Sequence, residues 1–167
     1  MNDAFYEHFV SRKPRIKDYL LQVLMIVGII IVSYILAAFI GSLGLTLGLV
    51  GIFLVIYLVF PRFKVEYEYS LLNHYLEISA IYNKEGRKKK ADMDIQKAEI
   101  IAPTGSPRVG HYKATKKLDF SSGRKDAKTF SIFSTSSDQK LCEIIIEPDE
   151  TMIHHMKGWM GSKMYLD

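Results

Sequence analysis

Four consecutive cations form the most concentrated charge in the sequence: Arg87, Lys88, Lys89 and Lys90, with Lys84 before them and Lys97 after them. Three carboxylates lie in the same stretch, which leaves residues 84–97 with a net charge of +3. Such a run can contact anionic lipid head groups, at roughly 1 kcal/mol for each cation near the surface, or an acidic protein partner. On an edge strand the same cations would prevent one sheet from pairing with another. Both interpretations stay open at this point.

Residues typical of catalysis or metal binding are few and poorly spaced. His154 and His155 are adjacent, so on a helix they point about 100° apart and cannot chelate one metal ion together. Glu66 and Glu68 would share one face of a strand, where a solvated face is the simpler interpretation than acid–base catalysis. No nucleotide-binding loop, nucleophile elbow, HExxH or CxxC motif occurs. We therefore expect no enzymatic activity, no cofactor and no metal.

A second basic stretch could suggest nucleic-acid binding. The cations of this stretch are Arg108, Lys113, Lys116, Lys117, Arg124, Lys125 and Lys128. Only two carboxylates, Asp119 and Asp126, oppose them. The aromatic residues there do not alternate with the cations as a base-stacking platform would require. We expect no nucleic-acid partner.

The elements that must position these residues begin with a long apolar segment. Residues 19–60 contain no Asp, Glu, Lys or Arg, whereas one membrane crossing needs only about 20 apolar residues. Two helices, at residues 19–40 and 45–60, therefore fit, with the reversal at the glycines of residues 41–44. The segment is too long for a cleaved signal peptide, and a chain this short would struggle to bury it in a soluble core. A hairpin confined to one leaflet remains open as an alternative.

Cations flank this segment on both sides, and its turn has none. They are Arg12, Lys13, Arg15 and Lys17 before the first helix, and Arg62 and Lys64 after the second. Because positively charged flanks stay on the cytoplasmic side, we expect a multi-pass protein of the plasma membrane with both termini in the cytoplasm. The single cysteine, Cys142, excludes an intramolecular disulfide, which agrees with a reducing compartment.

Small residues recur at helical spacing in the hairpin: Ala37, Gly41, Gly44, Gly48 and Gly51. A face of small side chains lets two helix backbones approach closely. That approach could occur within the hairpin or between two copies of the protein. The pattern therefore makes a homo-oligomer one of the expected assemblies.

The remaining chain divides into a short N-terminal segment and a β domain. Residues 1–18 could form a short helix capped by Asp3, with a frayed tail as the alternative. From residue 61 to residue 167 the period changes to two, which predicts strands at residues 65–70, 75–82, 87–92, 95–102, 117–121, 128–134 and 140–147. An amphipathic helix behind an Asp149 cap ends the chain, and we expect Met152, Met156, Trp159 and Met160 to contact the sheet.

This order resembles a pleckstrin-homology-type barrel, and the sequence is similar to bacterial PH-like membrane proteins with a pair of transmembrane helices. The resemblance lies in Tyr67-Glu68-Tyr69-Ser70, Leu76-Glu77-Ile78, Arg87-Lys88, Ile95 and Ala98-Glu99-Ile100. It implies an α+β protein, with a transmembrane helical hairpin followed by a seven-stranded antiparallel PH-like barrel or sandwich and a C-terminal helix. The whole chain also resembles a small uncharacterised family of two-span bacterial membrane proteins, which implies no activity.

Phosphoinositide recognition does not follow from this resemblance, because residues 71–74, between the first two strands, contain no Lys or Arg. The leading hypothesis is a membrane-anchored, non-enzymatic PH-like module that binds a protein partner or the anionic surface of the lipid bilayer. The alternative is a structural scaffold subunit of a membrane assembly, which self-associates through its glycine-rich hairpin.

Overall fold

The computed structural model describes residues 5–135 and 140–166, and the chain divides into two compact units. The first, which we call the hairpin unit, comprises Pro14–Val65 together with Tyr82–Gly86. The second, the sandwich unit, comprises Met1–Lys13, Glu66–Ile81 and Arg87–Asp167. The sandwich unit is therefore discontinuous in sequence, because it contains residues from both sides of the hairpin.

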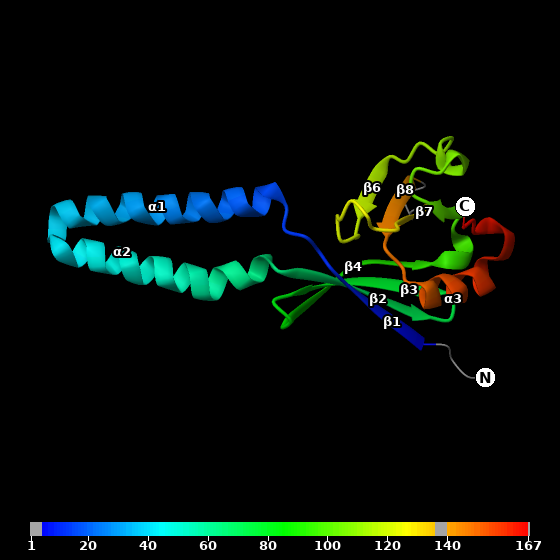
Figure 1. Cartoon of the computed structure of the whole chain (residues 1–167), viewed down its shortest axis with the longest axis horizontal. Helices are drawn as coiled ribbons and strands as arrows, with labels where there is room; N and C mark the ends of the chain where they lie inside the picture. The colour runs from blue at the N-terminus through cyan, green and yellow to red at the C-terminus, as the bar shows by residue number, and fades with distance from the viewer. Residues whose placement is uncertain (1–4, 136–139, 167) are drawn as a thin grey trace. The chain divides into compact units, whose positions relative to one another are not determined.

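Two apolar helices form most of the hairpin unit (Figure 1). Helix α1 spans Ile16–Ile40 and helix α2 spans Ser42–Leu54, with Gly41 between them at a φ of +63°. Helix α2 continues as a π-helical turn, η1 (Val55–Val59), and a 3-10 turn, η2 (Phe60–Phe63). The second apolar helical segment, Ser42–Phe63, is therefore 22 residues long. The predicted second helix, at residues 45–60, was too short at both ends.

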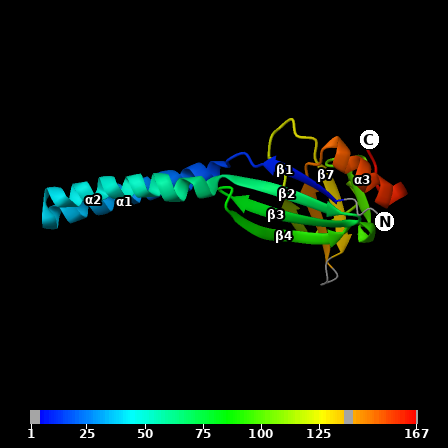
Figure 2. The ribbon, with the colours of Figure 1, turned by 90° about the horizontal axis from the view of Figure 1, so that it is seen from below.

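The first sheet of the sandwich unit contains four strands in the order β1-β2-β3-β4 (Figure 2). They are β1 (Phe5–Ser11), β2 (Val65–Leu72), β3 (Tyr75–Tyr82) and β4 (Gly86–Asp94). Strand β1 pairs antiparallel with β2, with His8 opposite Tyr69 and Val10 opposite Tyr67. The prediction of a helix in this N-terminal segment was therefore wrong, and its proposed cap Asp3 lies outside the described residues.

The second sheet has the order β5-β7-β8-β6. Its strands are β5 (Ile100–Pro103), β6 (Lys116–Asp119), β7 (Phe130–Thr135) and β8 (Leu141–Ile146), and the 3-10 turns η3 (Ile95–Lys97) and η4 (Pro107–Val109) lie on either side of β5. Strands β6 and β8 are parallel. The described residues thus form eight strands with one parallel pair, which corrects the prediction of seven antiparallel strands.

Helix α3 (Glu150–Met160) and the 3-10 turn η5 (Gly161–Lys163) follow the second sheet. As predicted, Asp149 caps the helix, because its Oδ1 accepts a hydrogen bond from the Met152 N–H at 2.9 Å. Met152, Met156 and Met160 are buried, but Trp159 is 41% exposed and lies edge-on to the His74 ring. Trp159 was expected to contact the sheet together with the methionines, but its ring contact is with His74, in the turn between β2 and β3, and it is not buried.

The core of the sandwich unit contains large side chains from both sheets and from α3. Tyr69 is fully buried, and its hydroxyl donates to the Phe120 carbonyl at 2.7 Å and accepts from the Glu147 N–H at 3.2 Å. A smaller cluster lies between the second sheet and the loop after β5, and it comprises Ile100, Ala102, Val109 and Phe133. Both sheets are therefore fixed by apolar packing, which is the main stabilising term in folding.

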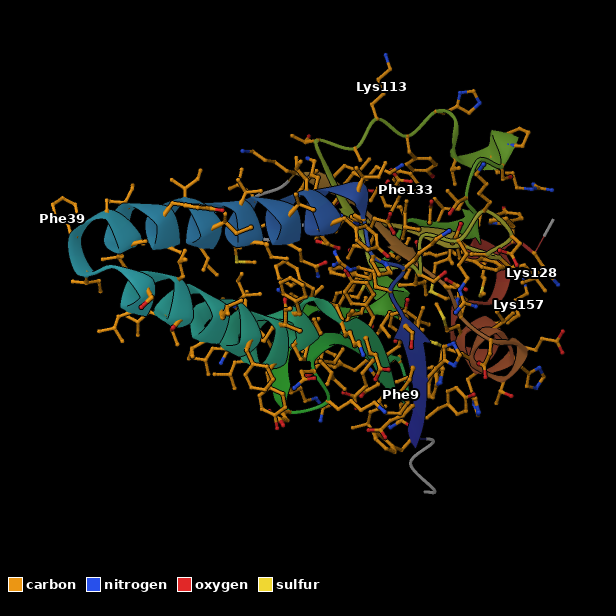
Figure 3. The ribbon with its side chains drawn as sticks, turned by 60° about the vertical axis from the view of Figure 1, so that its left-hand side comes forward. Phe9, Phe39, Lys113, Lys128, Phe133 and Lys157 are labelled. Carbon is orange, nitrogen blue, oxygen red and sulfur yellow. The ribbon has the colours of Figure 1, made fainter. Side chains whose placement is uncertain are left out.

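Apolar side chains in the hairpin unit are exposed to an unusual degree. Phe39, near the turn between the helices, is 83% exposed and points away from the chain (Figure 3). Ser33 of α1 is buried, as are Gly44 and Gly48 of α2. Helix α1 and the second helical segment, Ser42–Phe63, are both long and apolar enough to cross a membrane.

Candidate functional site

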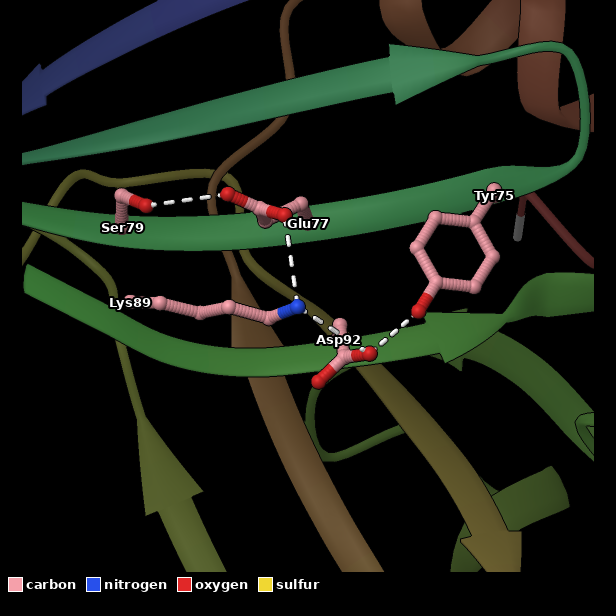
Figure 4. Close-up of polar contacts among 5 residues, drawn as sticks. All are labelled: Tyr75, Glu77, Ser79, Lys89 and Asp92. Carbon is pink, nitrogen blue, oxygen red and sulfur yellow. Dashed lines mark hydrogen bonds and ion pairs between the residues drawn. The ribbon is translucent and has the colours of Figure 1, made fainter.

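The basic run lies on β4, where two of its cations are paired within the sheet. Arg87 Nη2 lies 2.6 Å from Glu68 Oε1. Lys89 Nζ lies 3.4 Å from Glu77 Oε2 and 3.3 Å from Asp92 Oδ2 (Figure 4). The contacts join three neighbouring strands of the first sheet. At least two of the four cations in the predicted lipid-binding run therefore hold the sheet's own carboxylates.

Burial and hydrogen bonding shift the pKa values of these carboxylates in opposite directions. Burial raises the pKa of Glu68, and the nearby Arg87 guanidinium only partly opposes that effect. A hydrogen bond from the Tyr75 hydroxyl lowers the pKa of Asp92, despite the opposing effect of burial, and Lys89 lowers it further. Asp92 is therefore ionised at neutral pH and is poorly suited to act as a general acid.

The other cations of this group do not form one cluster. Lys88 and Lys90 are exposed on β4, and Lys97 in η3 lies 3.9 Å from Asp94. Lys84 belongs to the hairpin unit, in the turn between β3 and β4, with a φ of +60°. The six residues that sequence spacing grouped together thus lie in three different elements: strand β4, the turn η3 and the turn between β3 and β4.

A pocket of about 560 Å³ opens between the second half of β4 and the second sheet. We call it the inter-sheet pocket. Its apolar lining includes Ala91, Met93, Leu118 and Ile144. Its charged lining consists of Asp92 and Asp94, with Lys97, Lys116 and Lys140. Sequence spacing identified only Lys97 as a binding residue here, because Lys116 in β6 and Lys140 just before β8 are brought to β4 only by the fold.

The inter-sheet pocket is bordered by the free edges of both sheets. Strand β4 is the last strand of the first sheet, and β6 is the last strand of the second. Among the described residues, neither strand has a partner on its outer side, so its outward backbone N–H and C=O groups are available. Lysines crowd the first half of β4, but residues 91–94, which line the pocket, contain no cation.

The small residues of the hairpin lie where its two helices approach most closely. A Cβ atom on Gly44 would lie 2.3 Å from the Ala37 backbone nitrogen, and one on Gly48 would lie 1.8 Å from Ser33 Oγ. Gly51 is less constrained, at 3.4 Å from Ile29, and Gly41 forms the turn. The glycine face of α2 is therefore covered by α1 of the same chain.

The flanking cations fall in both units. Arg15, Lys17, Arg62 and Lys64 belong to the hairpin unit, at the ends of its helical segments. Arg12 and Lys13 belong to the sandwich unit, where the Lys13 N–H donates to the Ser122 carbonyl at 2.8 Å. Lys13 is therefore tied to the β domain, although it lies only three residues before helix α1 in the sequence.

The histidines do not form a metal site in the described part of the chain, where no group of three or more His, Cys, Asp or Glu side chains is placed to hold an ion. His155 contacts the Tyr6 ring, with ring centroids 5.7 Å apart. His8 Nδ1 lies 3.7 Å from Asp149 Oδ2, and the Tyr6 hydroxyl donates to that same oxygen. These contacts join β1 to the start of α3 and serve the fold.

Two four-stranded sheets with a C-terminal helix packed into their core define an α+β domain of the pleckstrin-homology-like class. The family model described as "Bacterial PH-like domain (DUF6106)" matches residues 2–166, and the chain belongs to this family. The match includes β1 and both apolar helices, so the hairpin is part of the family pattern. No curated protein and no solved structure matches the chain.

Proposed function

We propose that this chain is a membrane-anchored, non-enzymatic PH-like module that binds an extended, acidic segment of a protein partner in the inter-sheet pocket. The observation that carries the proposal is the position of that pocket between two free sheet edges. An extended peptide can add to such an edge through backbone hydrogen bonds, while alternate side chains enter a pocket. The pocket volume of about 560 Å³ is in the range of ordinary binding sites.

The chemistry of the pocket favours a segment in which apolar and acidic side chains alternate. The apolar lining, from Ala91 to Ile144, suits an aliphatic side chain. Three lysines of the lining, Lys97, Lys116 and Lys140, outnumber its two aspartates. Both aspartates already form ion pairs, Asp92 with Lys89 and Asp94 with Lys97. A carboxylate on the incoming segment would therefore meet net positive charge.

The cations of β4 are confined to its first half, so one half of the strand is protected against edge pairing and the other half is available for docking. Arg87 to Lys90 occupy the first half of the strand, where cations prevent unspecific pairing of sheet edges. The second half lacks this protection and lies against the pocket. One strand thus combines a protected segment with an available one, as expected when only one segment is meant to be paired.

The connection of the strands supports the membrane anchor. Strand β1 precedes the hairpin, β2 follows it, and the two are hydrogen-bonded neighbours. The chain must therefore leave and re-enter the sandwich unit on the same side of any membrane that the hairpin enters. This requirement agrees with two crossings and with cations on both flanks. The exposed apolar side chains of both helices have the distribution expected of a segment surrounded by lipid.

The two other hypotheses have less support. Contact with the anionic lipid surface could not use Arg87 and Lys89 fully, because these two cations hold carboxylates of the sheet. Self-association through the hairpin was suggested by its glycine face, but α1 covers Gly44 and Gly48. Neither hypothesis uses the inter-sheet pocket.

A peptide selection on the full-length protein in lipid nanodiscs tests the proposal. We expect a library of random, displayed dodecapeptides to yield sequences in which acidic and aliphatic residues alternate. Binding of a selected peptide, measured by fluorescence anisotropy, should weaken at least about tenfold in the triple variant Lys97→Glu, Lys116→Glu, Lys140→Glu, which corresponds to about 1.4 kcal/mol.

The control variant carries the same change in charge away from the pocket. Lys113, Lys125 and Lys128 are exposed and do not line the inter-sheet pocket, and Lys113 and Lys128 are labelled in Figure 3. Their replacement by Glu should leave peptide binding within about twofold of the original. Selection of peptides with no acidic preference, or equal loss in both triple variants, would contradict binding in this pocket.

A further inference from the structure

A second pocket, of about 700 Å³, lies wholly within the hairpin unit at the end of its second helical segment. We call it the interface pocket. Tyr57 and Leu58 of the π-helical turn and Pro61 and Arg62 of the 3-10 turn form one side. The other side consists of residues from the turn between β3 and β4, which are Tyr82, Asn83, Glu85 and Gly86.

Backbone hydrogen bonds hold the two sides together. The Asn83 N–H donates to the Lys64 carbonyl at 3.1 Å, which ties the turn to the residue after the helix. Within the turn, the Glu85 N–H donates to the Tyr82 carbonyl at 3.1 Å, and Asn83 and Lys84 have φ values of +52° and +60°. Lys84 in this conformation is unusual, because lysine rarely adopts positive φ. The departure of η1 and η2 from α-helical geometry is also typical of functional sites in helices.

The interface pocket is lined by one cation and one anion, Arg62 and Glu85. Among the residues that the structure describes, neither side chain has an ion-pair partner within 4.0 Å, and Arg62 and Glu85 do not pair with each other. Both are exposed. A ligand that carries a negative and a positive group close together could therefore contact both side chains at once.

The position of the pocket along the chain indicates where such a ligand would come from. Tyr57 lies near the end of the second apolar segment, and tyrosines are enriched at the level of the lipid head groups. Arg62 and Lys64 follow directly. If the hairpin is anchored as proposed above, on which this inference rests, then the pocket lies at head-group depth, with Leu58 toward the acyl chains.

We propose that the interface pocket binds the phosphoethanolamine head group of a zwitterionic phospholipid. Arginine is well suited to bind phosphate oxygens, because its guanidinium presents several N–H donors in a planar fork. The ammonium group, joined to the phosphate by an ethylene bridge, would meet the Glu85 carboxylate in a pocket that Tyr57 and Tyr82 also line. A phospholipid with a neutral alcohol head group would leave Glu85 unpaired beside its phosphate.

The preference for this lipid can be measured on full-length protein in nanodiscs that contain equal amounts of phosphatidylethanolamine and phosphatidylglycerol. Native mass spectrometry of the released complex should show the ethanolamine lipid enriched about threefold to tenfold over the glycerol lipid. Glu85→Gln should abolish this preference, because the ammonium loses its ionic partner. Arg62→Gln should reduce retention of both lipids.

Matched controls use exposed residues that do not line the pocket, Glu150→Gln and Arg124→Gln, which should leave the lipid ratio unchanged. Soluble glycerophosphoethanolamine distinguishes a free head group from a lipid, since a lipid site should keep its bound lipid in the presence of this competitor. Displacement of the lipid by the soluble compound would overturn the lipid assignment. Equal retention of the two lipids, or an unchanged ratio in Glu85→Gln, would overturn the proposal as a whole.

Failure of this inference is distinguishable from failure of the proposed function. A protein that does not enter nanodiscs would contradict the membrane anchor itself. A protein that enters them, binds the selected peptide and shows no lipid preference would contradict only the interface pocket.

Discussion

The hairpin unit and the sandwich unit distribute their side chains in opposite ways. In the sandwich unit, Tyr69, Ile132 and Met156 are almost completely buried, and most exposed positions are polar. In the two helices of the hairpin unit, Leu24 and Phe39 are 65% and 83% exposed, whereas the buried positions are Ser33, Gly44 and Gly48. In water the first arrangement follows from the hydrophobic effect, and in lipid the second follows from the need for close helix contact. Under the proposed membrane anchor, the comparison means that the two units are adapted to different solvents.

The largest expected effect comes from truncating a buried side chain of the sandwich unit. Met156 is fully buried, so Met156→Ala should lower the free energy of unfolding by about 2–5 kcal/mol, because it removes apolar contacts and leaves a cavity. Leu24→Ala, at an exposed hairpin position, should change it by less than about 0.5 kcal/mol. Thermal unfolding of full-length protein in nanodiscs, followed by circular dichroism of the β signal, measures both. A loss from Leu24→Ala as large as that from Met156→Ala would refute the assignment of two solvents.

An intermediate effect is expected from adding one methyl group where the two helices meet. In Gly44→Ala the new Cβ would lie 2.3 Å from the Ala37 nitrogen, and because this neighbour is backbone, the helices must separate. We expect a cost of about 1–3 kcal/mol, seen as faster hydrogen exchange of hairpin amides. Gly28→Ala is the matched control, since nothing lies within 4 Å of its added Cβ. Equal exchange in the two variants would show that the glycine face does not hold the hairpin together.

A smaller effect is expected at Asp149, which joins β1 to α3. Burial alone would raise its pKa, but hydrogen bonds from Tyr6 and the Met152 N–H, together with His8, lower the pKa below its ordinary value of 3.8. A carboxyl whose pKa is lowered on folding stabilises the protein above its unfolded pKa, and this contribution is lost as the pH falls through the folded value. The sandwich unit should therefore lose this stabilisation below about pH 4.

Two substitutions separate the cap from the charge at this position. Asp149→Ala removes the cap and should cost about 1 kcal/mol at neutral pH. Asp149→Asn keeps a good capping side chain but cannot titrate, so its unfolding free energy should depend less on pH between about pH 5 and pH 2. Urea unfolding across this range measures both effects. An unchanged pH dependence in Asp149→Asn would show that other carboxyls account for the acid sensitivity.

Much of the fold could be predicted from the sequence where the pattern was local. The alternation in residues 65–70 and 75–82 predicted β2 and β3, and the spacing of Met152, Met156 and Met160 predicted α3. The long uncharged segment predicted two helices. In each case the signal lies within one segment and reflects one covered face, so it does not depend on distant parts of the chain.

The sequence predictions that were wrong concern residues whose structure depends on partners far away in the sequence. In β1 the residues Tyr6, His8 and Val10 alternate as a strand, but Phe5 and Phe9 also fit a helix, and only the pairing with β2 decides between them. The parallel pairing of β6 with β8 has no local signal either. Trp159 matched the helical spacing of the methionines, yet it lies at the margin of the buried face, against His74.

The candidate site was the least predictable part. Sequence spacing identified the cations of β4, but it gave no indication that Glu68 and Glu77 from neighbouring strands neutralise two of them. Lys116 and Lys140 reach the inter-sheet pocket only because the second sheet places β6 and β8 opposite β4. The lining of this pocket comes from β3, β4, β6, β7 and β8, so no single strand carries a sequence pattern that predicts it.

The pairing of β1 with β2 across the hairpin has a consequence for the synthesis of the protein. The ribosome releases β1 first, then the two apolar helices, and only afterwards the strand that β1 must join. If the hairpin is a membrane anchor, as proposed above, β1 remains a short, unpaired segment until the hairpin inserts, with its backbone groups satisfied by water. Insertion would then bring this strand and the emerging β2 to the same side of the bilayer. Under that proposal, assembly of the first sheet is coupled to membrane insertion, and a chain whose hairpin failed to insert would have to close that sheet around an unprotected apolar loop.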